Sequence, residues 1–325
     1  MKLRQLEYVI AVARENFSVS AAANRLFTSQ PGVSKQLRAL EDELGVELFR
    51  RNGRQFTGVT PEGEQVLALA RDIFSRVSDI RDLAADAAGR RSRPLRIATT
   101  HTQARYALPS VVERFLATNP GVELNIHQGT PDQLAALARQ HEVDLVIATE
   151  ALELFTDLTL LPCYYWNRVI LVPRDHPLTT ASRPTLKEIA EYPLVTYVFA
   201  VGGNRLLDRT FGAAGLSPRI ALTAVDTDVI KTYVRLGMGI GIVAGMSYDP
   251  AQDPDLVALP ADHLFEDSVT LIGLRPSRYL RRHVQEFISL FAAHLTPDLV
   301  AAAIAAGPNN DPLATLPPGT ELPRR

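Results

Sequence analysis

Cysteine and long apolar runs are almost absent from this chain of 325 residues. The single cysteine, Cys163, excludes an intramolecular disulfide and is typical of a reducing compartment. No apolar run reaches the roughly 18 to 20 residues that a membrane span requires. The first residues form an amphipathic pattern interrupted by Glu7 and Arg14, which is unlike a signal peptide. We therefore expect a cytoplasmic protein with no membrane partner.

Signatures of catalysis and of metal binding are also missing. His101, His127 and His141 lack the spacing of metal ligands, and no cysteine cluster accompanies them. The sequence has no G-x-S-x-G motif and no acid pair with an evident base. The glycine-rich stretch at 237–245 lacks the context of a dinucleotide site. We expect neither an enzyme nor a cofactor, and we expect Cys163 to be inert packing.

The charges are unevenly distributed along the chain. The net charge is −2, yet residues 1–58 carry nine Lys or Arg against six Asp or Glu, a local balance of +3 that leaves −5 for the remainder. A basic head on an acidic body fits a modular protein whose head contacts phosphate, although +3 is also common on an ordinary solvated surface. The length itself predicts two or three domains.

Two short helices joined by a tight turn are predicted within the head. Residues 18–26 suit a short alanine-rich helix with capping serines, and the cluster at 27–32 then breaks it. The next helix runs to about residue 44 and ends at Gly45, with apolar residues on one face. A plain helical hairpin would give the same pattern as a reader of the major groove. On the outer face lie side chains that can contact bases or phosphate: Thr28, Ser29, Gln30, Ser34, Lys35 and Arg38.

A hairpin signal follows these helices. Asn52-Gly53 is a strong two-residue turn between short strands. A two-stranded wing here would place Arg50, Arg51 and Arg54 on the DNA backbone beside the groove. Residues 1–59 are therefore predicted to form a winged helix-turn-helix.

The head also resembles a known family. The stretch SAAANRLFTSQPGVSKQLRALEDELGVELFRR, followed by TPEGE, resembles the N-terminal signature of the LysR-type transcriptional regulators. The resemblance implies binding to double-stranded promoter DNA, with the outer-face residues at or near the bases and the wing arginines on phosphate. It further implies a homodimer or homotetramer, with RNA polymerase as an expected partner.

A long helix is predicted over residues 60–89. Thr60-Pro61-Glu62 is a helix start. Apolar residues then alternate by four and three: Val66, Ala70, Ile73, Val77, Ile80, Ala84 and Ala87. A helix lying on its own core would show the same stripe, but no such core is evident nearby in the sequence. We expect a dimerisation helix that presents two heads to two half-sites, followed by a hinge.

The remainder, residues 90–297, is predicted to be an α/β domain. Apolar runs alternate with amphipathic helices, which favours a mostly parallel sheet covered on both faces. We expect one half at about 94–163 with a return at about 268–295, and a second half at about 164–267. The family resemblance implies a clamp like the periplasmic binding proteins (type 2), with an effector cleft between the halves. The Pro-rich residues 298–325 are expected to be a disordered tail.

The ends of two predicted strands carry candidate effector ligands. Thr100, Thr102 and Gln103 follow the first strand and precede a helix, and Thr149 ends another. Such strand ends meet in a cleft, where hydroxyls and helix N-termini suit an anion, although a threonine there can simply cap the helix. The sequence alone leaves both interpretations open.

Further stretches are similar to the CysB-like subfamily, activators of cysteine biosynthesis and sulfonate use; they include THTQARYALP, LPCYYWNRVILVPRDHPL and DVIKTYVRLGMGIGIV. This resemblance implies that Thr100, Thr102, Gln103 and Thr149 contact the effector, with Trp166 at the cleft. It implies a sulfur-pathway effector such as sulfate, adenosine phosphosulfate, O-acetylserine or N-acetylserine.

One position departs from that subfamily pattern. Gly202 stands where the subfamily commonly has a threonine, although the backbone N–H groups of Gly202 and Gly203 could still bind an anion. Two alternatives therefore stay open: a LysR-type regulator of another pathway, and a clamp that merely captures a solute.

Overall fold

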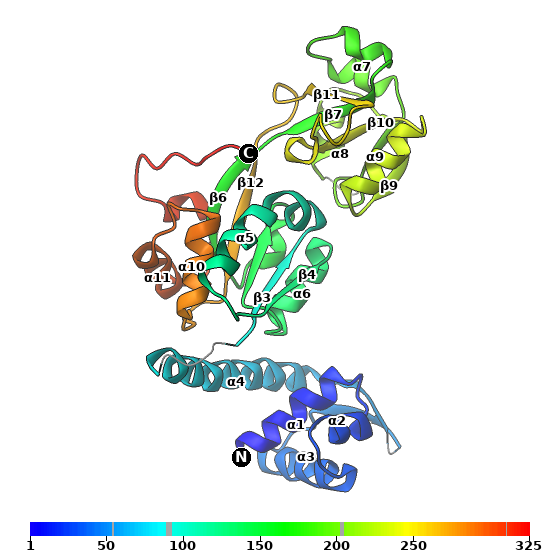
Figure 1. Cartoon of the computed structure of the whole chain (residues 1–325). Coiled ribbons are helices and arrows are strands. Elements are labelled where there is room, and N and C mark those ends of the chain that lie inside the picture. Colours follow the sequence, from blue (N-terminus) through cyan, green and yellow to red (C-terminus); the bar gives the residue numbers. More distant parts are fainter. Residues whose placement is uncertain (54, 89–92, 202–204, 310) are drawn as a thin grey trace. The chain divides into compact units, whose positions relative to one another are not determined.

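The structure, a computed structural model, describes all residues of the chain except 54, 89–92, 202–204 and 310. The chain divides into two compact units, Met1–Arg81 and Asp82–Arg325 (Figure 1). Helix α4 (Pro61–Ala87) begins in the first unit and ends in the second. Within the described residues, no helix is both long enough and apolar enough to cross a bilayer.

Three helices and a hairpin form the first unit together with the start of α4. They are α1 (Leu3–Arg14), α2 (Val19–Arg25), α3 (Gln30–Leu44), β1 (Phe49–Asn52) and β2 (Gln55–Val59). The serine hydroxyls cap the helices as the sequence predicts: Ser18 accepts from the Ala21 amide, and Ser29 accepts from the Gly32 amide. Gly45 ends α3 in the left-handed conformation, with φ +72°. The predicted winged helix-turn-helix is confirmed.

The core of the first unit collects apolar side chains from every element in it. On α3, Val33, Leu37 and Leu40 are fully buried, and burial of each such side chain contributes roughly 1.5–3 kcal/mol. Leu44, predicted to continue this stripe, is 40% exposed because the helix ends there. From α4, Leu67 and Ala70 join the same core.

The second unit contains two five-stranded sheets. The first has the strand order β4-β3-β5-β12-β6, and the second has the order β11-β7-β10-β8-β9. The strands of the first are β3 (Leu95–Thr99), β4 (Leu124–Gln128), β5 (Leu145–Ala148), β6 (Thr159–Trp166) and β12 (Ser268–Leu274). The strands of the second are β7 (Arg168–Pro173), β8 (Leu194–Tyr197), β9 (Ile220–Ala224), β10 (Ile240–Ala244) and β11 (Leu256–Pro260). We call the parts built on these sheets subdomain I and subdomain II.

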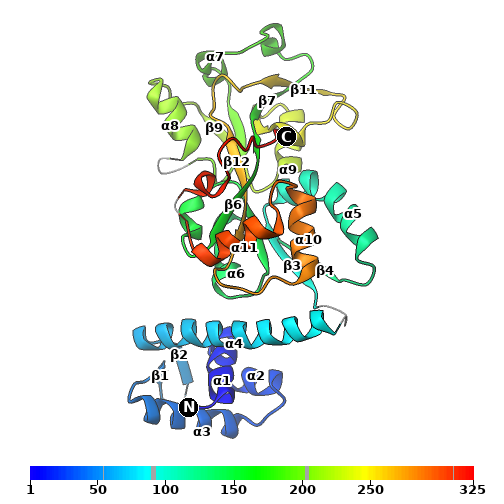
Figure 2. The ribbon, with the colours of Figure 1, turned by 90° about the vertical axis from the view of Figure 1, so that its left-hand side faces the viewer.

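The antiparallel pair β6 and β12 joins the two subdomains (Figure 2). Trp166 pairs with Ser268 at the end of this ribbon, and the chain enters subdomain II at β7. The crossing between the subdomains therefore falls just after Trp166. Only two strands connect the subdomains there, so the cleft lies beside a narrow ribbon.

Helices cover both faces of the first sheet, as expected for parallel strands with continuous apolar runs. Along β3, Leu95 and Ile97 face the core beneath α5 (Pro109–Thr118) and α10 (Arg282–Phe291), whereas Ala98 faces α6 (Pro131–Arg139). Subdomain II carries α7 (Leu186–Ala190), α8 (Leu206–Ala213) and α9 (Thr227–Arg235). The predicted two-part, periplasmic-binding-protein-like domain is confirmed.

The C-terminal segment differs from the predicted disorder. Helix α11 (Pro297–Ala306) buries Val300 and Ile304 against the core of subdomain I. Farther on, the Tyr165 amide donates to the Pro323 carbonyl at 2.8 Å, and the Arg325 amide donates to the Tyr165 carbonyl at 2.9 Å. The many prolines suggested a chain without order, but an apolar helix and two backbone bonds to β6 tie this segment to the domain.

Candidate DNA interface and effector cleft

The outer face of α3 presents polar and basic side chains. Gln30, Lys35 and Arg38 are exposed, and Ser34 is half-buried beside Gln30, whose amide donates to its hydroxyl at 3.2 Å. The opposite face is the buried apolar stripe, so the fold fixes which side chains point outward. The geometry is that of a helix able to enter a major groove.

The turn before α3 holds the remaining predicted contacts of this helix. Ser29 is exposed, but its hydroxyl oxygen is engaged as the helix cap, 3.3 Å from the Gly32 amide. Thr28 is half-buried. Their backbone and side-chain atoms surround the N-terminal end of α3, which is the end of a recognition helix that approaches base edges.

The wing arginines occupy different environments. Arg50 is exposed on β1. Arg51 instead forms an ion pair with the buried carboxylate of Glu41 and lies over the Phe56 ring, 5.1 Å from its centroid. Arg51 therefore links the wing to α3, and its contact with phosphate stays a prediction. Arg54 lies outside the described residues.

The apolar surface of α4 differs from the predicted seam. Ala70 is buried in the unit's own core, and Val66 and Ile73 pack against that core. The large exposed apolar side chains are Leu69, Ile80 and Leu83. The hairpin and α1–α3 together supply the core that was not evident from the nearby sequence. The exposed stripe is the part left for a partner helix, and dimerisation stays a prediction.

Hydroxyl groups from both subdomains meet at the predicted cleft. Thr102, three residues beyond the end of β3, is buried, and its Oγ1 lies 3.4 Å from Tyr197 Oη and 3.4 Å from Thr227 Oγ1. The latter two atoms lie 2.6 Å apart. Thr102 belongs to subdomain I, whereas Tyr197 ends β8 and Thr227 begins α9 in subdomain II. Burial raises the pKa of Tyr197, which keeps its hydroxyl neutral and able to donate.

The other predicted effector residues lie around this cluster. Thr100 is buried and Thr149, which follows β5, is half-buried. Gln103 is buried but turned into subdomain I, where it accepts from the Tyr164 hydroxyl and donates to Thr270 Oγ1 at 3.4 Å. Its amide therefore holds the β6–β12 ribbon in this structure. Gly202 lies outside the described residues.

The ribbon end contributes a charged pair and two buried polar atoms. Trp166 is buried, and among the described residues neither its Nε1 nor Asn167 Oδ1 has a hydrogen-bond partner. The guanidinium of Arg168 lies 4.9 Å from the centroid of the Trp166 ring, donates to Ser268 Oγ at 2.8 Å and forms an ion pair with Glu150. Burial raises the pKa of the Glu150 carboxyl, and the charge of Arg168 opposes this shift.

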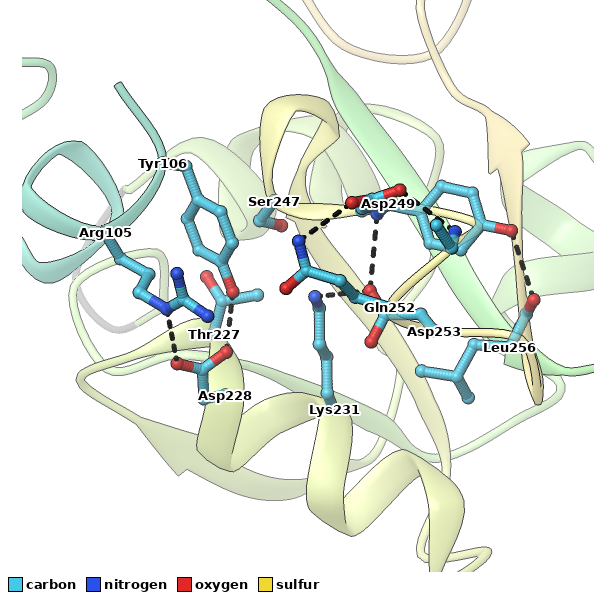
Figure 3. A network of polar contacts seen from close by, with 12 residues as sticks. Arg105, Tyr106, Thr227, Asp228, Lys231, Ser247, Asp249, Gln252, Asp253 and Leu256 are labelled. Atoms are coloured by element: carbon cyan, nitrogen blue, oxygen red, sulfur yellow. Dashed lines mark hydrogen bonds and ion pairs between the residues drawn. The ribbon is translucent and has the colours of Figure 1, made fainter. Parts of the chain in front are cut away.

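A second contact across the cleft centres on Asp228, near the start of α9 (Figure 3). Tyr106 Oη donates to Asp228 Oδ1 at 2.6 Å, and Arg105 Nε lies 3.7 Å from Oδ2. His101 Nε2 also lies 3.4 Å from Oδ2. Burial opposes ionisation of this carboxyl, but the hydrogen bond from Tyr106, together with the nearby His101 and Arg105, holds the pKa of Asp228 below its usual range.

The lysine beside this contact belongs to a separate network in subdomain II (Figure 3). Lys231 Nζ donates to Asp253 Oδ2 at 2.5 Å and lies 5.3 Å from the centroid of the Tyr106 ring. Arg235 pairs with the other oxygen of Asp253 at 2.8 Å. These pairs anchor α9, the helix that supplies Thr227 and Asp228 to the cleft.

Cys163 lies in the core of subdomain I. Cys163 is fully buried, and burial raises the pKa of its thiol. A neutral thiol in an apolar core is a poor nucleophile, as the sequence interpretation expects. Across the described part of the chain, no group of three or more His, Cys, Asp or Glu is placed to hold a metal ion.

Two family models match the chain. Residues 3–64 match the helix-turn-helix of bacterial regulatory proteins of the lysR family, and residues 88–296 match the LysR substrate binding domain. The second match alone covers more than half of the chain. The chain belongs to the LysR family.

Relatives within the LysR family share the chain over nearly its whole length. The HTH-type transcriptional regulator CysB of Haemophilus influenzae is 47% identical over 310 residues, covering 95% of this chain and 96% of that protein. The HTH-type transcriptional regulator SsuR of Burkholderia cenocepacia is 46% identical over 304 residues, covering 94% and 99%.

Solved structures agree with the fold of this LysR-family chain. The cofactor-binding domain of the Cbl transcriptional regulator is 41% identical and has a TM-score of 0.61, covering 66% of this chain and 94% of that one. Full-length CbnR complexed with its target DNA has a TM-score of 0.58 at 23% identity, covering 90% and 99%. The latter likeness supports the fold alone.

Several residues at the cleft of this LysR-family chain escaped the sequence interpretation. Tyr197, Thr227 and Asp228 come from subdomain II, and Glu150 and Arg168 form the ion pair at the ribbon. The only local signal for the first group was the helix start around Asp226, which caps α9 by accepting from the Val229 amide. Nothing in the sequence links that start to Thr102, which lies 125 positions away from Thr227.

Proposed function

We propose that this LysR-family protein regulates transcription of genes for sulfur assimilation and sulfonate use, as an activator, in response to a small anionic or polar effector. The support is the high identity to regulators named CysB and SsuR over almost the entire chain. We further propose that it works in the cytoplasm as a homodimer or homotetramer, contacts RNA polymerase and carries out no catalysis.

Recognition of double-stranded DNA is assigned to α3 and the wing. We assign Gln30 and Ser34 to base edges, and Lys35 and Arg38 to guanine or phosphate, because these side chains lie on the outer face of α3. We also assign phosphate contacts to the three arginines that the sequence analysis named for the wing (Arg50, Arg51 and Arg54); such contacts position the protein without reading sequence. Dimerisation through the exposed apolar stripe of α4 would let two copies of α3 engage two half-sites.

Effector sensing is assigned to the cleft, and the observation that carries this proposal is the buried hydroxyl cluster that joins the subdomains. Thr102 contributes from one side, and Tyr197 and Thr227 contribute from the other. A ligand bound among these hydroxyls touches both subdomains and therefore favours the closed form over the open form. Trp166 Nε1, buried and without a partner within the described structure, is a further donor for an oxygen of the ligand.

Closure of the effector cleft is proposed to alter the packing of the subunits. A ligand shifts an equilibrium only by its differential affinity for the two forms, so it must bind the closed cleft more tightly. Closure then changes how the subunits pack in the dimer or tetramer. This packing in turn changes how the protein contacts the promoter. Effector candidates are sulfate, adenosine phosphosulfate, O-acetylserine and N-acetylserine, all of which present oxygens to hydroxyl donors.

Calorimetry on the full-length protein tests the sensing half of the proposal. We expect one of these four compounds to bind saturably, and we expect Thr102→Val to weaken that binding by about tenfold, because one hydroxyl contact across a buried site is lost. Thr118→Val, on the exposed end of α5, is the matched control and should bind as the wild type does.

Two outcomes would contradict the proposal. Normal binding by Thr102→Val would show that the effector lies elsewhere. Silence of all four compounds with a folded protein would favour a LysR-type regulator of an unrelated pathway with a different effector.

A further inference from the structure

Phe27 is the most exposed large apolar side chain in the first unit as described. It lies in the turn between α2 and α3, and 97% of its surface is accessible. Its backbone is left-handed, with φ +50°. This region of conformational space is unfavourable for a bulky L-amino acid.

The hydrogen bonds of the turn explain why a left-handed residue is required there. The Thr28 amide donates to the Ala23 carbonyl at 3.0 Å, and the Phe27 amide donates to the Asn24 carbonyl at 3.2 Å. These two bonds form the Schellman motif that ends α2, in which the left-handed position is usually glycine and sometimes asparagine. A phenylalanine at this position is therefore strained, and its exposed ring gains no burial in return.

A strained and exposed residue points to a role outside the fold itself. Phe27 directly precedes Thr28, Ser29 and Gln30, which surround the N-terminal end of α3. A recognition helix turns this end toward base edges, and the turn before it lies at the wall of the groove. The apolar surfaces at that wall are the deoxyribose rings and the methyl groups of thymine.

We propose that Phe27 is a DNA-contacting residue whose ring packs on deoxyribose and thymine methyl groups at the wall of the major groove. The inference rests on the proposed DNA-binding function and extends it to a residue that is neither polar nor charged. Because the ring neutralises no phosphate, its contribution to binding is independent of salt concentration. Because its backbone is strained, its removal stabilises the protein.

Because the Phe27 ring contacts no phosphate and its backbone is strained, we expect its removal to weaken DNA binding and to raise the Tm. The probe is a duplex selected from random-sequence DNA by the wild-type full-length protein. In Phe27→Gly and Phe27→Asn, we expect the Kd for this duplex to rise about tenfold, equivalent to about 1.4 kcal/mol. The slope of log Kd against log salt should stay unchanged, and the Tm of the first unit should rise by about 5 °C.

Two control variants separate this contact from other effects. Leu3→Ala removes another exposed apolar side chain, from α1, and should leave the Kd unchanged. Lys35→Ala should weaken binding and also reduce the magnitude of the salt slope by about 1, as the loss of a phosphate contact does. A higher Tm with a higher Kd cannot arise from misfolding.

Five outcomes would overturn the inference. Unchanged affinity in both Phe27 variants would remove the ring from the interface, and lost transcription with unchanged affinity would assign it to a protein contact. A reduced salt slope would show that a neighbouring charge is responsible, and a lower Tm would show that the ring supports the fold. If the wild-type protein selects no duplex at all, the DNA-binding function fails and this inference fails with it.

Discussion

Neutralising Asp228 should weaken effector binding without touching the hydroxyl cluster. Asp228 is the subdomain II partner of Tyr106, Arg105 and His101 from subdomain I. In Asp228→Asn the amide oxygen still accepts from Tyr106, whereas the negative charge that attracts Arg105 is lost. The substitution therefore acts on the closed form, in which the two subdomains meet.

The size of the effect follows from exposure and geometry. Asp228 and Arg105 are about half exposed, at 47% and 50% of their side chains, so the pair contributes only about 0.2–1 kcal/mol. The bond from Tyr106 loses a charged acceptor, which costs about 1 kcal/mol more. A total of about 1–2 kcal/mol corresponds to a rise of roughly 5- to 30-fold in the apparent Kd where closure limits binding.

Calorimetry of the full-length protein with its effector measures this change. Asp208→Asn, on the exposed surface of α8, removes the same charge from subdomain II and should leave the Kd unaltered. Tyr106→Phe alone should weaken binding, and the double variant should be less affected than the sum of the two because the residues share one bond.

An unchanged Kd in Asp228→Asn would refute the assignment of this contact to closure. Strict additivity in the double variant would refute it as well, since it would show that Tyr106 and Asp228 do not act together in the bound form. Equal losses in Asp228→Asn and Asp208→Asn would indicate a general effect of charge on the effector.

Two further predictions concern stability. A Cβ on Gly63 would lie 2.1 Å from the Leu48 carbonyl oxygen. Gly63→Ala should therefore lower the free energy of unfolding of the first unit, measured in urea, by about 1–3 kcal/mol. The control Gly212→Ala places its Cβ in open space and should not destabilise the protein. Burial, aided by the charge of Arg281, lowers the pKa of His283 to about 4. Between about pH 6.5 and 4 the unfolded state then binds more protons than the folded state, so the free energy of unfolding should fall by about 3 kcal/mol as the pH drops through this window. In His283→Leu, the free energy of unfolding from chemical denaturation should depend less on pH over the same window.

The DNA-binding unit was largely predictable because its signals are local. Capping serines, the left-handed Gly45 and the alternation of apolar residues on α3 all act within a few positions of one another. The ion pair of Arg51 with Glu41 was not predictable, since it depends on the wing folding back against α3. A charged residue in a hairpin gives no sign of whether it faces DNA or its own domain.

Among the described residues, the sequence predicted candidate cleft residues of subdomain I but not Tyr197 and Thr227 of subdomain II. Thr100, Thr102 and Thr149 follow strands, and strand ends can be located from the apolar runs. Tyr197 and Thr227 meet Thr102 only because β6 and β12 bring the second sheet against the first, a relation that no local pattern encodes. The packing of Val66, Ala70 and Ile73 of α4 on a core of their own was unpredictable for the same reason, because that core comes from residues far earlier in the chain.

The two cleft substitutions together separate ligand contact from closure. The apparent Kd of such a clamp is the intrinsic Kd divided by the fraction of closed protein. Thr102→Val changes both quantities, because Thr102 also bonds Tyr197 and Thr227 when the cleft is closed. Asp228→Asn changes only the closed fraction, so its effect must be the same for every compound that binds the closed cleft. A loss in Thr102→Val that varies between compounds, beside a constant loss in Asp228→Asn, would therefore identify Thr102 as the residue that touches the effector.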